Sequence, residues 1–180
     1  MNQPLTFTIL LFVLAAISAV TAVWAIRQSP TTLAKCESLP RNILFGIIIA
    51  GIDLAWCVPE SQPLVPAGMK PWLIPMAIAS LWIVYQFLDY IFSRALGGLL
   101  ILLAHYLLFA SFAYQAPLAP LFSTFCLAMG TLGIFFCGKP HLMRDLIRKI
   151  SSSKRWRYSF AATSAAYAVL FFVIAILFIK

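Results

Sequence analysis

The sequence predicts an all-α protein, a polytopic bundle of six transmembrane helices with one short amphipathic helix on the cytoplasmic membrane surface. Hydrophobic residues make up 63% of the 180 positions and charged residues 10%, against roughly 45–50% and 25% in a soluble domain. Nearly uncharged stretches of about 20 residues recur, long enough to cross the roughly 30 Å hydrocarbon layer of a bilayer. The net charge of +8 is gathered in alternate loops.

These stretches predict six spans within one transmembrane domain, residues 1–180. The spans run over about 5–26, 42–58, 71–88, 95–114, 118–137 and 160–179. Proline-rich segments separate several of them, as in "PESQPLVPAGMKP" at 59–71 and "QAPLAP" at 115–120. Proline cannot continue a helix interior, so both segments indicate turns.

The first stretch, "LTFTILLFVLAAISAVTAVWA" at 5–25, also has one feature of a cleaved signal peptide. Val23 and Ala25 resemble the small residues that precede a cleavage site. However, no Lys or Arg precedes the stretch, and its apolar run exceeds the roughly 7–15 residues usual in signal peptides. We therefore expect it to be the first helix of the mature protein.

The loop charges predict the orientation, because short loops rich in Lys and Arg stay on the cytoplasmic side. One alternating set of loops holds most of the basic residues: Arg27, Lys35, Arg41, Arg94, Lys139, Arg144, Arg148, Lys149, Lys154, Arg155 and Arg157. The other set holds Lys70 and Lys180. We therefore expect a multi-pass protein of the bacterial inner membrane with both termini on the non-cytoplasmic side.

The segment at about 140–150 predicts the interfacial helix. Its apolar residues recur at helical spacing, and its charged residues occupy the other side; the apolar set is Leu142, Met143, Leu146, Ile147 and Ile150. We expect a hinge at 151–153, with Trp156 at the depth of the lipid headgroups before the last span.

The basic residues around this helix are candidates for contact with anionic lipid headgroups or a partner protein. With one tryptophan, the set is Lys139, Arg144, Arg148, Lys149, Lys154, Arg155, Trp156 and Arg157. The simpler alternative is an orientation signal with no further task. The expected partners are membrane lipids, anionic at the cytoplasmic face, and other membrane subunits; nucleic acid is not expected, because the basic residues are few and close to the membrane.

Two ionisable residues lie inside predicted spans, Asp53 in "GIIIAGIDLAWCVPE" and His105 in "LLILLAHYLLF". Ionisable side chains are costly within a bilayer, so they usually face the bundle interior and have a partner. Gly46 and Ala50 share a helix face with Asp53 and allow another helix to approach it. Asp53 can be a proton or cation site, alone or paired with His105, or both residues can serve as structural hydrogen-bonding groups.

No metal or cofactor is expected. The second histidine, His141, lies in a predicted cytoplasmic loop, far from His105. The four cysteines form no C-x-x-C pair, so no zinc set has the required spacing.

"MKPWLIP" and "AHYLLF" are similar to segments of lysoplasmalogenase-like membrane hydrolases. The spacing between the segments is shorter here, and that family has more membrane spans. We therefore assign no family.

The function predicted from these observations is that of a non-catalytic accessory or assembly subunit that packs against other membrane proteins. Small residues along several spans allow close helix packing and favour this interpretation. A small proton- or cation-linked transporter using Asp53 and His105 is the first alternative. A lipid-modifying membrane enzyme is the second, although no catalytic arrangement of residues nominates one.

Overall fold

The computed structural model describes residues 3–29, 33–87 and 90–179, and this part of the chain is helical with connecting turns. The long helices are α1 (Gln3–Ile26), α3 (Ile43–Ser61), α4 (Leu73–Phe87), α5 (Ile91–Ala113), α6 (Ala119–Gly138) and α8 (Lys154–Ile179). The short helices are α2 (Leu33–Glu37) and α7 (His141–Ser152), with 3-10 turns at Leu39–Arg41 and Ala67–Trp72. Six helices are long and apolar enough to cross a membrane, the pattern of a multi-pass membrane protein.

The predicted spans correspond to the long helices, but several ends differ. α3 continues to Ser61, past the predicted end at Val58, with Pro59 inside its last turn. Proline lacks a backbone N–H, so Pro59 cannot bond to the carbonyl four residues before it, and the helix ends within two residues of it. The predicted end of the third span at Leu88 lies outside the described residues.

α5 begins at Ile91, four residues before the predicted start at Ala95, and therefore includes Arg94. The prediction placed Arg94 in a loop because of its charge. In the structure its Nη1 donates a hydrogen bond to the carbonyl oxygen of Cys137 at 3.2 Å, at the end of α6. A basic side chain near a helix C-terminus satisfies a carbonyl that has no partner within its own helix.

α8 begins at Lys154 rather than at the predicted Phe160, and the three-residue hinge is reduced to Ser153. Ser153 has an extended backbone, with φ −118° and ψ 123°. The Arg157 side chain reaches back and donates to the carbonyl oxygen of Ser151 at 2.8 Å. This bond holds the α7 end against the first turns of α8, so one extended residue is enough for the change of direction.

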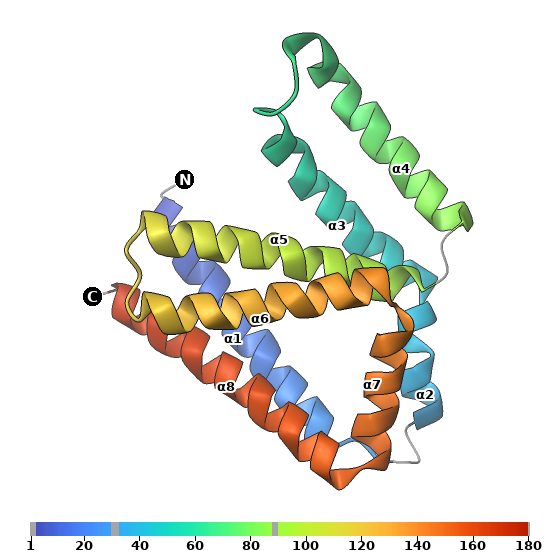
Figure 1. Cartoon of the computed structure of the whole chain (residues 1–180), viewed down its shortest axis with the longest axis vertical. Coiled ribbons are helices and arrows are strands. Elements are labelled where there is room, and N and C mark those ends of the chain that lie inside the picture. Colours follow the sequence, from blue (N-terminus) through green and yellow to red (C-terminus); the bar gives the residue numbers. More distant parts are fainter. Residues whose placement is uncertain (1–2, 30–32, 88–89, 180) are drawn as a thin grey trace.

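Helices α1, α5, α6 and α8 form the core of the molecule (Figure 1). At one end, the ring of Phe7 lies 5.8 Å from that of Tyr114 and 5.4 Å from that of Phe178. Phe122, at the start of α6, packs edge-on against Phe7. The start of α1, the end of α8 and the α5–α6 turn therefore lie together.

The opposite end of the core is closed by α7, which connects α6 to α8 (Figure 1). Ile150 of α7 is buried together with Ala25 at the end of α1 and Ala161 in α8. Ile147 is also buried, while Arg148 and Lys149 are exposed. The predicted helix at 140–150 thus forms as α7, and its apolar residues contact the ends of the core helices.

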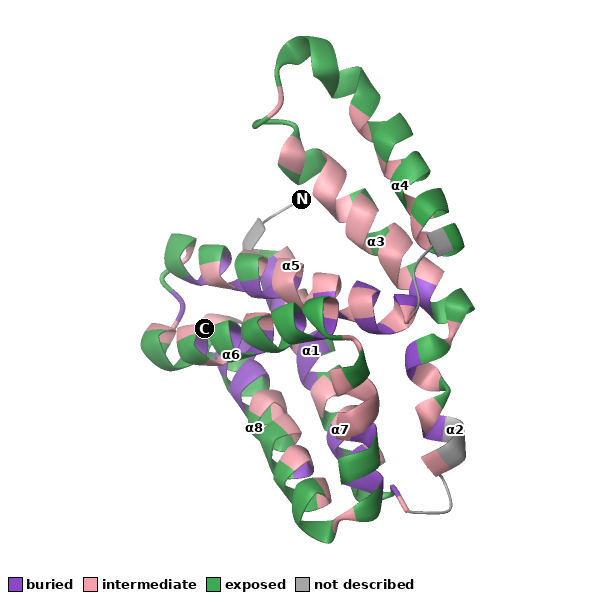
Figure 2. Ribbon diagram, turned by 45° about the vertical axis from the view of Figure 1, so that its right-hand side comes forward, coloured by how far each residue is buried: buried purple, intermediate pink, exposed green. Residues whose placement is uncertain are grey.

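The α3–α4 hairpin diverges from the core (Figure 1). α3 packs along α5 near the start of both helices, where a Cβ atom on Gly46 would lie 2.7 Å from the backbone nitrogen of Phe92. α4 packs mainly against α3. No residue from Ala67 to Gln86 is buried, and the ribbon of this part of the hairpin is green and pink, without purple (Figure 2).

Candidate functional site

The three basic loops meet at the end of the bundle that α7 closes. The hydroxyl oxygen of Tyr90 accepts hydrogen bonds from Arg41 at 2.8 Å and from Arg144 at 3.4 Å. The ring of Tyr90 also lies under the Arg41 guanidinium, 5.1 Å from its central carbon. One tyrosine thus joins the loop before α3, the start of α5 and α7. The side chain of Lys35 and the whole of Lys180 lie outside the part of the chain that the structure describes.

A second contact joins α2 to α7, where Arg148 and Glu37 form an ion pair. The hydrogen bond from Arg148 lowers the pKa of the Glu37 carboxyl below its ordinary value. Glu37 was not among the predicted site residues. In the sequence, Glu37 stands out only as an acidic residue in a loop that otherwise carries basic residues.

Cys36, beside Glu37, is buried, and its thiol donates to the side-chain oxygen of Gln28 at 3.2 Å. Burial raises the pKa of the Cys36 thiol, which keeps it protonated and poorly reactive. All four cysteines are free thiols.

The basic candidates differ in their contacts and fall into three sets. Arg144, Arg148 and Arg157 hold parts of the chain together through the bonds described above. Lys149 lies over the ring of Trp156, with its nitrogen 5.1 Å from the ring centroid. The remaining candidates are exposed at the helix ends and are not drawn into a common site: Lys139, Lys154 and Arg155.

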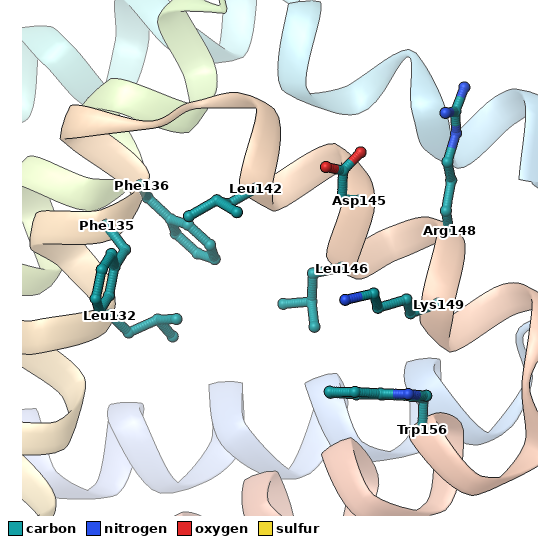
Figure 3. A pocket seen from close by; sticks show the side chains of 9 residues that line it. All are labelled: Leu132, Phe135, Phe136, Leu142, Asp145, Leu146, Arg148, Lys149 and Trp156. Atoms are coloured by element: carbon teal, nitrogen blue, oxygen red, sulfur yellow. The ribbon is translucent and has the colours of Figure 1, made fainter.

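An apolar cavity of about 560 Å³ opens beside Lys149 and Trp156 (Figure 3). It lies between α6, α7 and the first turns of α8, and its lining includes Phe135 and Phe136. The cavity is not among the sites predicted from the sequence. The aromatic pair just before the end of α6 was its only signal, and such a pair is equally typical of ordinary packing.

Asp53 lies in α3 and faces α5, where its Oδ2 would be 3.0 Å from a Cβ atom on Gly98. Its Oδ1 is buried and has no hydrogen-bond partner among the described residues. His105 lies in α5, two helical turns beyond Gly98, and its side chain is exposed. Within the described residues no hydrogen bond or ion pair joins Asp53 to His105.

No group of three or more metal-ligating His, Cys, Asp or Glu side chains occurs among the described residues. No protein-family model matches this sequence, and neither a curated protein nor a solved structure matches it.

Proposed function

We propose that this chain is a non-catalytic accessory or assembly subunit of a bacterial inner membrane, and that it packs against another membrane protein through the α3–α4 hairpin. The observation that carries the proposal is the packing of α4. The 3-10 turn and α4 together form an apolar segment that has no buried residue between Ala67 and Gln86, and the main neighbour of α4 is α3.

The packing of the other helices supports this role for α4. In lipid, helices associate through close van der Waals packing rather than through the hydrophobic effect, and small residues at the contact allow it. In the core these residues already meet within the chain, as Gly97 and Gly133 do. On the hairpin, Gly51 has no atom within 4 Å of its Cβ position. With Ala55 and Ala77 it lines part of a groove of about 290 Å³ between α3 and α4. A partner helix can therefore approach the α3–α4 hairpin closely.

The orientation belongs to the same proposal. The end of the bundle closed by α7 faces the cytoplasm, because the basic loops gather there and such loops stay on that side. The start of α1 and the end of α8 then lie on the non-cytoplasmic side. The free end of the α3–α4 hairpin, which includes Lys70, lies there too.

Transport through Asp53 has less support. The unpaired Oδ1 of Asp53 is a group that can take up a proton. However, Asp53 packs against Gly98, and the exposed His105 does not complete a site with it. A single carboxylate between two helices also serves as a polar packing group.

A site-specific crosslinking experiment tests the accessory role. A photo-crosslinking residue replaces Trp82 of α4, and a matched control replaces Phe109 of α5; these side chains are 64% and 69% exposed. We expect a discrete crosslinked band with one protein from position 82 in native membranes, and none from position 109. Equal labelling at both positions, or lipid adducts alone at position 82, would contradict the proposal.

A further inference from the structure

The cavity beside α7 has one apolar wall and one charged corner. Its lining comes from the end of α6, from α7 and from the start of α8: Leu132, Phe135, Phe136, Leu142, Asp145, Leu146, Arg148, Lys149 and Trp156. Leu132 and the two phenylalanines form one side, and Leu142 and Leu146 continue it along α7 (Figure 3). Its volume of about 560 Å³ is within the roughly 300–1,000 Å³ range of small-molecule sites.

The charges at the cavity are not balanced. Arg148 is paired with Glu37, and Asp145 lies 3.7 Å from the Nε of Arg144. Lys149 has no ion-pair partner among the described residues. Its amine points into the cavity above the flat ring of Trp156 (Figure 3). The charge left without a counter-ion at this cavity is therefore positive.

The position of the cavity limits what can fill it. It lies at the basic end of the bundle, where tryptophan and lysine side chains are typical of headgroup depth. A soluble anion would use Lys149 but leave the phenylalanine wall bare. An uncharged lipid would cover the wall but leave Lys149 without a counter-ion. An anionic phospholipid satisfies both parts, because its phosphate and its acyl chains belong to one molecule.

We propose that this cavity is a binding site for one anionic phospholipid of the surrounding bilayer. An acyl chain lies against Phe135, Phe136 and Leu146, and the phosphate is held by Lys149 above Trp156. The site is separate from the α3–α4 hairpin, so it does not depend on the accessory role proposed above. It assigns a ligand to Lys149 and Trp156 in particular, rather than to the basic residues as a group.

The test uses native mass spectrometry of the full chain in detergent, titrated with phosphatidylglycerol or with phosphatidylcholine of the same acyl chains. We expect one phosphatidylglycerol to bind more tightly than phosphatidylcholine. Lys149→Gln should weaken its binding about fivefold, the effect of one basic residue near an anionic headgroup. Lys154→Gln is the matched control, because Lys154 is exposed at the same end and does not line the cavity.

A second variant tests the apolar wall. Phe135→Ala should weaken phosphatidylglycerol binding, while Phe109→Ala, at another exposed phenylalanine, should leave it unchanged. Equal losses for Lys149→Gln and Lys154→Gln would show a diffuse charge effect and overturn the site. Glycerol phosphate has the phosphate but no acyl chain. If it fully displaced the lipid, the cavity would bind only a phosphate group, and the proposed lipid site would be overturned.

Discussion

Individual glycines decide how closely the core helices approach. A Cβ atom on Gly97 would lie 2.6 Å from the carbonyl oxygen of Gly133, and one on Gly133 would lie equally close to the carbonyl oxygen of Gly97. Neither position can hold a larger residue unless the backbones of α5 and α6 separate. Gly51 differs, because nothing lies within 4 Å of the Cβ position there.

Replacing Gly97 with Ala should therefore destabilise the protein. The added methyl group overpacks the α5–α6 contact, and we expect a loss of about 1–3 kcal/mol in the free energy of unfolding. The measurement is unfolding of the detergent-solubilised protein by a denaturing detergent. Gly51→Ala is the control and should be neutral or stabilising by up to about 1 kcal/mol, since alanine is the better helix former. Equal losses for the two variants would refute the close-contact explanation.

Among the elements, α2 and α7 are joined to each other and to the loops by polar contacts in addition to the burial of Cys36, Ile147 and Ile150. α2 has five residues, too few to be stable alone. Glu37 at its end is paired with Arg148 of α7, and Arg144 one turn earlier donates to Tyr90. The surface at this end is therefore held by side chains from three loops far apart in the sequence.

The Glu37–Arg148 pair predicts a pH dependence of α2. Because Arg148 lowers the pKa of Glu37, the pair stabilises the folded arrangement fully above the ordinary glutamate value of about 4.3. That stabilisation is lost as the pH falls through the lowered pKa of the folded state. We expect hydrogen exchange at 33–37, corrected for intrinsic rates, to quicken in that acidic range.

Glu37→Gln should quicken the same exchange already at neutral pH and remove its acid dependence. Glu60→Gln is the control, since Glu60 lies at the far end of α3 and has no ion-pair partner among the described residues. If Glu37→Gln left exchange at 33–37 unchanged, the pair would not hold α2 in place.

On the scale of the whole molecule, charge is separated along the bundle. The basic loops meet around α7, while the aromatic cluster of Phe7, Tyr114 and Phe178 lies at the other end with few charges near it. Such an arrangement suits a protein inserted in one direction, because positive loops resist transfer across the inner membrane.

The proposed orientation can be tested with reporter fusions. A reporter enzyme active only outside the cytoplasm should be active when fused after Lys180 and inactive when fused after Ser153. The opposite pattern should follow with a reporter active only in the cytoplasm. Activity of the same reporter at both positions would rule out the six crossings.

The sequence by itself determined the six long apolar helices, the short helix near 140–150 and the alternation of charge between loops. These features could be predicted because hydropathy, helical period and loop charge depend on neighbouring residues. The starts of α5 at Ile91 and of α8 at Lys154 could not be predicted. Arg94 and Arg157, which lie inside these helices, donate hydrogen bonds to backbone carbonyls of other helices, and such contacts leave no local pattern in the sequence.

Only the tertiary structure decided which faces meet. It placed Glu37 beside Arg148, left His105 exposed with no bond to Asp53, and formed an open cavity between Phe135 and Lys149. The rotation and crossing of each helix follow from the shapes of side chains on both partners, such as the glycines of α5 and α6. Those shapes act across long separations in the chain, so no local pattern in the sequence records the contacts that they produce.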